Sequence, residues 1–409
     1  MEEVYIADAA RSPIGKFLGS LSQITATRLG AEVLRAVVSR TKTDPASIDE
    51  VIVGNVISAG LGQNVAKQVV VYSGLPNKIP AYSVNKVCAS SLKAVGLAAE
   101  SISCGNAEVI AAGGVESMSN APFSIKGIRK LQKLGNIGLD DFLGRMKQAG
   151  LSTSGFQMDD EMLGEGLMDC YSGMHMGAIA ENLSGKYGIT RKDADQFALE
   201  SHRKAAIATD SGKFKREIIP VKNHEGKTID EDEGIRRDTS LEKLAALKPA
   251  FTPSGIITAG NASQLSDGAS FLMLMSGSKI KECGIKPLAK IESFAASGSD
   301  PGEYGTAPVP SAQKALEMAK IRLSDVDLIE LNEAFCVQAL AVVKELGIDK
   351  SRLNVHGGAT AIGHPLGATG ACILSTLAYA LKDTGGEVGL ATLCHGGGGA
   401  YSIVIRRCD

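Results

Sequence analysis

Cys88 has the residue type and the position of a nucleophile. An apolar, strand-like approach (81–87) leads into it, and small residues after it open a helix that ends near Gly105, so Cys88 lies at a helix N-terminus. Unpaired N–H groups and the helix dipole favour an anion there, so we expect a lowered thiol pKa and a thiolate suited to acyl transfer. A buried packing cysteine is the alternative, because that is the usual role of an intracellular cysteine.

The segments that must position Cys88 alternate between strand and helix. Residues 4–8 and 48–56 have strand patterns, and Thr25–Arg40 has the apolar spacing of a helix. The run 107–114 is typical of a central strand buried on both faces, and the loop expected after it, Gly113–Ser119, is a place where function can lie. This alternation predicts an α/β sheet covered by helices.

The second half of the chain repeats the pattern of the first. Ile48–Val53 and Val326–Leu331 share an apolar pattern at an offset of 278 residues, which carries Cys88 to position 366, beside His364. Both positions precede a small-residue helix that leads to a strand. A duplicated core predicts that the turns of Cys88 and His364 approach each other, at the strand ends where open α/β sheets bind ligands.

A stretch of different character separates the two halves. From about residue 122 to 250 charges rise and strand patterns thin out, with one clear helix over Thr190–Asp210. Thr190 is a plausible N-cap for that helix, and the stretch is too long for a simple loop. We therefore expect an N-terminal core half at 1–121, an inserted loop domain at 122–250, the end of the N-terminal half at 251–277 and a C-terminal core half at 278–409.

Four short motifs share their order and spacing with one known family. They are Val87-Cys88-Ala89-Ser90-Ser91, Asn332-Glu333-Ala334-Phe335, Gly363-His364-Pro365-Leu366-Gly367 and Cys394-His395-Gly396-Gly397-Gly398. Over essentially the whole chain the sequence resembles the thiolase family, and within it the acetoacetyl-CoA thiolase (acetyl-CoA C-acetyltransferase) branch. The resemblance implies a thiolase-like duplicated core of two βαβαβ-type halves, forming a layered α/β/α/β/α sandwich with an inserted loop domain.

The resemblance also implies a reaction: the reversible Claisen condensation of two acetyl-CoA to acetoacetyl-CoA plus CoA, through an acetyl-cysteine. Thioester exchange requires a nucleophile, and condensation requires a base that removes a weakly acidic proton. By resemblance Cys88 is the nucleophile, His364 activates it, and Cys394 transfers the proton at carbon. His364 and a water held by Asn332 form one oxyanion hole, and the N–H groups of Cys88 and Gly396 form the other.

Coenzyme A recognition is implied mainly for the inserted domain. The expected contact residues are Leu167, His175, Met176, Arg236, Ala259, Ser263 and Phe335, with Arg236 near the adenine and ribose. No metal and no permanently bound cofactor are implied, only CoA thioesters as substrates. The resemblance further implies a homo-oligomer, expected to be a dimer of dimers, and a place in isoprenoid-precursor or ketone metabolism. The stretch Gly127–Gln157 is longer than the family pattern.

Two other functions stay open. One is a broader-chain 3-ketoacyl-CoA thiolase of β-oxidation, although His175-Met176-Gly177 is typical of the short-chain branch. The other is a non-catalytic acyl-CoA or lipid-binding relative, because fold alone does not fix function. Asn332 could instead cap the following helix. His395 stands where the family has Ile or Asn, and His356 where Asn or Tyr is common; neither is assigned a catalytic role.

Composition argues against several classes of protein. The 409 residues have a formal net charge of −2 and 4% aromatic residues, which gives no signature for nucleic acid. The sequence contains no run of about 18 apolar residues, so it gives no signature of a membrane span. Eight dispersed cysteines without CxxC favour reduced thiols. The N-terminus starts at once with a strand pattern and the C-terminus is not Ser-Lys-Leu, so we expect a cytoplasmic protein.

Overall fold

The computed structural model describes residues 2–152 and 157–408. Its strands are β1 Val4–Arg11, β2 Gly15–Lys16, β3 Glu50–Gly54, β4 Ala81–Val84, β5 Val109–Ser117, β6 Phe123–Ile125, β7 Met158–Asp160, β8 Val221–Lys222, β9 Thr228–Ile229, β10 Ser266–Ser276, β11 Ala289–Gly298, β12 Leu328–Leu331, β13 Val388–His395 and β14 Gly399–Arg407. Its helices are α1 Ala26–Thr41, α2 Val65–Tyr72, α3 Ser90–Ser103, α4 Leu139–Gln148, α5 Met176–Tyr187, α6 Arg191–Asp210, α7 Leu241–Ala245, α8 Gly277–Cys283, α9 Pro308–Ala319, α10 Cys336–Leu346, α11 Ala359–Ile362 and α12 Thr369–Thr384.

Within the described residues, ten strands form one sheet in the order β12-β13-β14-β11-β1-β10-β5-β3-β4, with β2 beside β10. The order is nearly symmetric about the junction of β11 and β1, because the parallel pairs β12–β13 and β3–β5 occupy equivalent places on either side. Only two residue pairs join β1 to β11. Two half-sheets therefore meet at a narrow seam, as the duplicated sequence pattern predicts.

The register of the strands keeps the sequence offset. Gly54 of β3 pairs with Gly114 of β5, while Leu331 of β12 pairs with Thr392 of β13. The two half-sheets are therefore equivalent residue by residue where those strands end, with a shift of 277 or 278 positions. It follows that the residues just beyond these strand ends also correspond to each other.

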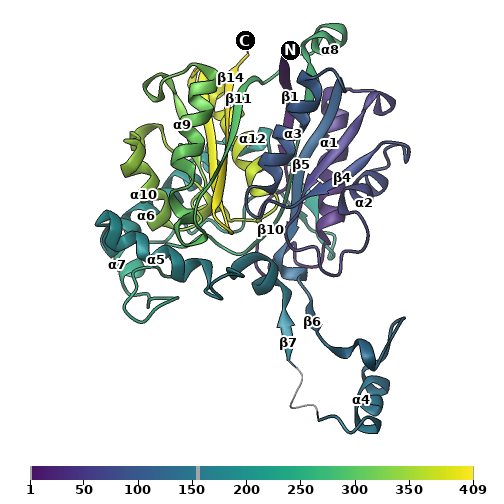
Figure 1. Cartoon of the computed structure of the whole chain (residues 1–409). Coiled ribbons are helices and arrows are strands. Elements are labelled where there is room, and N and C mark those ends of the chain that lie inside the picture. The colour runs from purple at the N-terminus through teal and green to yellow at the C-terminus, as the bar shows by residue number, and fades with distance from the viewer. Residues whose placement is uncertain (1, 153–156, 409) are drawn as a thin grey trace.

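Helices α3 and α12 lie between the two half-sheets, whereas α1 and α2 cover one outer face and α9 and α10 the other (Figure 1). One apolar cluster joins α3 and α12 to inward-facing residues of both half-sheets, and two further clusters fill the outer layers. This is the expected α/β/α/β/α layering. The starts of α3 and α12 touch, because the Ala371 N–H donates to Ser91 Oγ at 2.9 Å.

Strand β5 continues further than the sequence suggests. The expected loop over 113–119 is strand as far as Ser117, and all nine residues of β5 are buried. A Cβ on Gly113 would lie 2.0 Å from Ser270 O, and one on Gly114 would lie 2.1 Å from Gly367 O. The glycine pair therefore permits close backbone approach and does not end the strand.

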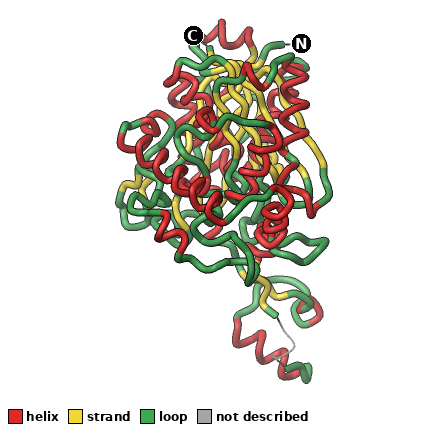
Figure 2. The backbone as a smooth tube through the Cα atoms, turned by 90° about the vertical axis from the view of Figure 1, so that its left-hand side faces the viewer, coloured by secondary structure: helices red, strands yellow, loops and turns green. Residues whose placement is uncertain are grey.

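The residues between β5 and β10 include α4–α7 and an arm. Figures 1 and 2 show β6, β7 and α4 projecting away from the layered body. The described residues of the long stretch 127–157 belong to this arm, and residues 153–156 lie outside the described part of the chain. Thr190 caps α6 in a capping box with Asp193, as predicted. None of the helices that the structure describes is both long and apolar enough to cross a membrane.

Candidate active site

Cys88 lies in a tight turn between β4 and α3. Val87 before it has φ 47°, a left-handed backbone conformation that is rare for a β-branched residue. Side chains of the turn hold this conformation: Ser90 Oγ donates to Val87 O at 2.6 Å, and the Val87 N–H donates to Asn85 Oδ1 at 2.9 Å. Ala89 is the N-cap of α3. Cys88 is thus placed directly ahead of a helix N-terminus, as the sequence predicts.

The sulfur of Cys88 faces the backbone N–H groups of Gly396 and of Cys88 itself. It packs beside an apolar cluster that contains Val56, Ile57 and Leu366. Burial raises the pKa of the Cys88 thiol to about 12, even though the two N–H groups favour its thiolate. The expected lowering of this pKa is therefore wrong for the free protein, because desolvation outweighs the helix start. A base must take the proton when the thiol reacts.

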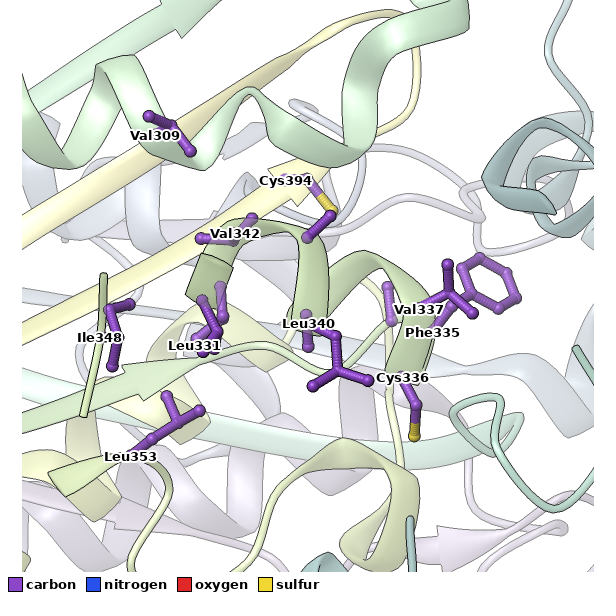
Figure 3. Close-up of a cluster of buried hydrophobic side chains, with 14 of the residues drawn as sticks. Val309, Leu331, Phe335, Cys336, Val337, Leu340, Val342, Ile348, Leu353 and Cys394 are labelled. Atoms are coloured by element: carbon purple, nitrogen blue, oxygen red, sulfur yellow. The ribbon is translucent and has the colours of Figure 1, made fainter. Parts of the chain in front are cut away.

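Cys394 is at the end of β13 and is buried. Figure 3 shows its side chain extending from the strand toward α10. Burial, and after it the charge of Cys88, raises the pKa of the Cys394 thiol well above its ordinary value. The pKa of Tyr304 is raised mainly by burial, and the charges of both thiols raise it further. The pKa of the Cys394 thiol thus depends on the charge of Cys88, so the two thiols lie within electrostatic range of each other.

His364 is buried in the turn before α12, and its hydrogen bonds identify its tautomer. Thr369 Oγ1 donates to Pro365 O at 2.9 Å, so the hydroxyl oxygen accepts from His364 Nδ1, 2.7 Å away. The proton is therefore on Nδ1, so Nε2 is unprotonated and its lone pair can act as a base. Asn332 Nδ2 lies 3.4 Å from that Nε2. Burial lowers the pKa of His364 to about 4.

Glu116 connects the turns that surround the site, and the sequence analysis missed it. Its carboxylate accepts from Gly367 N at 2.8 Å and from Val56 N and Ile57 N at 3.1 Å each. Asn55 Nδ2 also donates to it, at 2.9 Å. Burial raises the pKa of Glu116 to about 7 despite these donors. The signal that the sequence offered was a single acidic residue close after the apolar run that contains Gly113-Gly114.

Glu116 and Cys394 occupy equivalent places in the two halves. Both stand at the end of the strand that is parallel to its neighbour in each half-sheet, and by the same register Asn55 corresponds to Asn332. One half therefore uses this position for a carboxylate that accepts backbone N–H groups. The other half uses it for the buried free thiol of Cys394.

Three of the expected coenzyme A residues pack in the clusters that contain the two thiols: Met176 and Phe335 with Cys394, and Leu167 with Cys88. Met176 begins α5, and a Cβ on Gly396 would lie 3.6 Å from its sulfur. His175 caps α5 and stacks on Phe251, with 4.6 Å between ring centroids, and Phe251 meets Phe335 edge-on at 5.7 Å. The others are Leu167, which packs on the Cys88 cluster, Ser263, whose N–H donates to Ala334 O at 3.0 Å, and Ala259, which is exposed in the preceding turn.

Arg236 lies apart from them, in a pocket of about 190 Å³. Arg203, Arg237 and His202 line the same pocket. Burial, and after it the charge of Arg236, lowers the pKa of His202 to about 4, so its Nδ1 accepts from the Arg236 N–H at 3.1 Å. Three guanidinium groups, of which that of Arg237 is paired with Asp210 at 2.6 Å, give the pocket a positive character that suits phosphate. Nowhere in the described residues do three His, Cys, Asp or Glu side chains gather as metal ligands.

The sequence and the fold of the chain are similar to those of known proteins. The thiolase N-terminal domain family matches residues 4–278, and the thiolase C-terminal domain family matches residues 285–407. The acetyl-CoA acetyltransferase of Allochromatium vinosum is 44% identical over 99% of both chains. The Bacillus anthracis acetyl-CoA acetyltransferase structure is similar with a TM-score of 0.91 and 39% identity, covering 100% of this chain and 99% of that one. Human mitochondrial 3-ketoacyl-CoA thiolase in complex with CoA also has a TM-score of 0.91, with 35% identity and coverages of 100% and 98%.

These matches extend over both half-sheets and the residues between them. The chain therefore belongs to the thiolase family.

Proposed function

We propose that the chain is an acetyl-CoA C-acetyltransferase, which condenses two acetyl-CoA reversibly to acetoacetyl-CoA plus CoA. The observation that carries this proposal is the pairing of Cys88, whose sulfur faces the Gly396 N–H, with the second thiol of Cys394. The relatives of the chain also include several proteins named acetyl-CoA acetyltransferase. A nucleophilic thiol with a second thiol beside it supplies both steps of a thioester condensation.

The proposed first step is acetylation of Cys88. His364 Nε2 takes the thiol proton, and the sulfur attacks the carbonyl carbon of acetyl-CoA. The C–S bond to CoA then breaks, and the leaving sulfur receives a proton from Cys394. The Cys88 acyl carbonyl is positioned to accept from the N–H groups of Cys88 and Gly396, which stabilise negative charge on its oxygen.

In the second step the Cys394 thiolate takes a proton from the methyl carbon of a second acetyl-CoA. That carbon attacks the acetyl group on Cys88, the thioester breaks, and His364 returns the proton to the Cys88 sulfur. His364 Nε2 and a water oriented by Asn332 stabilise the enolate oxygen in this proposal. In its support, Asn332 Oδ1 is buried and has no hydrogen-bond partner among the described residues.

We further propose that residues 122–250 are the inserted domain that binds coenzyme A. Met176 and Phe335 near the thiols would bound the acyl and pantetheine end, and the Arg236 pocket would take the phosphate end. Leu167, His175, Ala259 and Ser263 complete the proposed set. The boundaries 1–121, 122–250, 251–277 and 278–409 are part of this proposal.

Trapping with ¹⁴C-acetyl-CoA tests the nucleophile. We expect one acetyl group on the Cys88 peptide, and a Cys88→Ser variant that carries none and has no activity, because an alcohol lacks the acidity of the thiol. Acetyl label on the Cys394 peptide would reverse the two roles. A thiolysis assay that compares acetoacetyl-CoA with 3-ketohexadecanoyl-CoA separates this function from the longer-chain one, since only the former should be cleaved efficiently.

A further inference from the structure

The turn that carries the Gly396 N–H consists of three glycines, 396–398, between β13 and β14. Gly397 and Gly398 have φ 81° and 88°. Glycine has more backbone freedom than any other residue, so such a turn keeps one conformation only where other groups hold it. Its far end is held by Ser299, whose N–H donates to Gly398 O at 3.1 Å.

The near end of the turn is held by the side chain of His395. His395 Nδ1 lies 2.7 Å from Gly396 O, and because a carbonyl only accepts, Nδ1 carries the proton and donates it. This bond closes a ring through the peptide group between His395 and Gly396. The N–H of that same peptide faces the Cys88 sulfur. The bond therefore restricts rotation of the group that points at the nucleophile.

The other ring nitrogen lies inside the hairpin. His395 is 9% exposed and pairs with Gly399 across β13 and β14. A Cβ on Gly399 would lie 2.5 Å from His395 Nε2, so the ring occupies the space that a side chain would need there. Within the described residues this Nε2 has no hydrogen-bond partner. The imidazole is thus packed inside the turn, where Nδ1 donates its hydrogen bond and Nε2 makes none to any described residue.

We infer that His395 is a positioning residue, which fixes the direction of the Gly396 N–H and so prepares the oxyanion hole of the acetyl-Cys88 intermediate. The inference rests on the proposed function, in which that N–H stabilises the acyl oxygen. Preorganised donors are effective because they need no reorganisation during the reaction. Leu and Asn make a useful contrast as replacements here, since a Leu side chain has no N–H and Asn has a side-chain nitrogen at the place of Nδ1.

The test compares His395→Leu with His395→Asn. Loss of an oxyanion-hole donor costs about 10²–10³ in kcat, so loss of its alignment should cost less, roughly tenfold in kcat with little change in KM. In His395→Leu the infrared carbonyl band of ¹³C-acetyl-Cys88 should move to higher wavenumber, because its hydrogen bond weakens. His395→Asn should keep kcat and the band near those of the wild type. Thermal melting checks that each variant is folded.

The infrared band distinguishes this role from a merely structural one. An unchanged band in folded His395→Leu, or an Asn variant as impaired as the Leu variant, would overturn the inference while leaving the proposed function intact. If His395→Leu does not fold, His395→Gln takes its place, because its amide nitrogen lies at the Nε2 position and cannot reach Gly396 O in the same way. Failure of the wild type to form acetyl-Cys88 would instead overturn the proposed function, and this inference with it.

Discussion

At the scale of single residues, His364 is neutral over a wide pH range. Its pKa is lowered from 6.5 to about 4 by burial, so the unprotonated base is present at any pH above that value and is lost only as pH falls through it. We predict that kcat/KM shows no acidic limb near pH 6.5 and falls only toward pH 4. A pH profile of initial rates, limited to the range where thermal melting shows a folded protein, measures this. An apparent pKa near 6.5 would mean that His364 is solvated.

Cys394 should act after Cys88. We predict that Cys394→Ala still acetylates Cys88, while condensation and thiolysis fall by about 10³-fold or more, because the proton transfer at carbon has lost its base. CoA is a stable leaving thiolate, so acetylation can proceed with water as the proton source. Single-turnover labelling and steady-state assays on the same preparation separate the steps. Equal loss of both would indicate a structural role for Cys394.

The chemical residue types could be recognised from sequence, but their electrostatic state could not. Cys88, His364 and Cys394 stand in short local motifs, so the sequence is sufficient to single them out. The raised pKa of Cys88 depends on apolar side chains from distant segments, which no local pattern records. Glu116 was missed for the same reason, because its partners are about 60 and 250 residues away.

At the scale of elements, the site depends on how closely α3 and α12 approach. A Cβ on Gly370 of α12 would lie 2.6 Å from the backbone nitrogen of Leu92 in α3. We predict that Gly370→Ala destabilises the fold by about 1–3 kcal/mol and slows Cys88 acetylation, because the two helix starts must separate. Thermal melting and an acetylation time course measure the two effects.

Gly185 supplies the matched control. It lies exposed in α5, and a Cβ there would meet nothing within 4 Å. Gly185→Ala should stabilise the helix by about 0.5–1 kcal/mol and leave acetylation unchanged, since Ala loses less backbone entropy than Gly. A Gly370→Ala variant that behaves like Gly185→Ala would show that the helix contact is not constrained.

Elements with strong periodicity were well predicted, and those with glycine were not. The helix over Ala26–Thr41 and the capped helix Arg191–Asp210 agree with the sequence within about a residue. Strand β5 extends further than the sequence predicts, because a loop was expected over Gly113–Ser119. Whether a glycine pair marks a turn or a close approach depends on the neighbouring backbone, here Ser270 and Gly367.

At the scale of the whole molecule, exposed apolar surface supports self-association. The edge strand β4 leaves Tyr82 37% exposed, and six large apolar residues among the described residues of the arm are more exposed still. These are Phe123, Leu134, Leu139, Leu143, Leu151 and Met158. An open strand edge and exposed large apolar side chains are features that association covers.

We therefore predict a homodimer that is required for activity, with two dimers joined into a tetramer. Pairing at β4 would support the turn of Cys88, which follows that strand directly. Multi-angle light scattering at several protein concentrations, with activity measured on each fraction, tests both parts. A fully active monomer would contradict the whole prediction, and an active dimer only its second part.

The two half-sheets carry different residues at their equivalent strand ends. This difference sets the number of reactive centres that we expect in one chain. If the two halves had stayed identical, both strand ends would carry the same residue. Neither half would then supply what the other lacks. Here Glu116 accepts N–H groups from both halves, while its counterpart Cys394 is a free thiol. The chain is in effect a fused pair in which one half supports the turns of the other, so we predict one acetyl group per chain in the trapping experiment although the architecture is double.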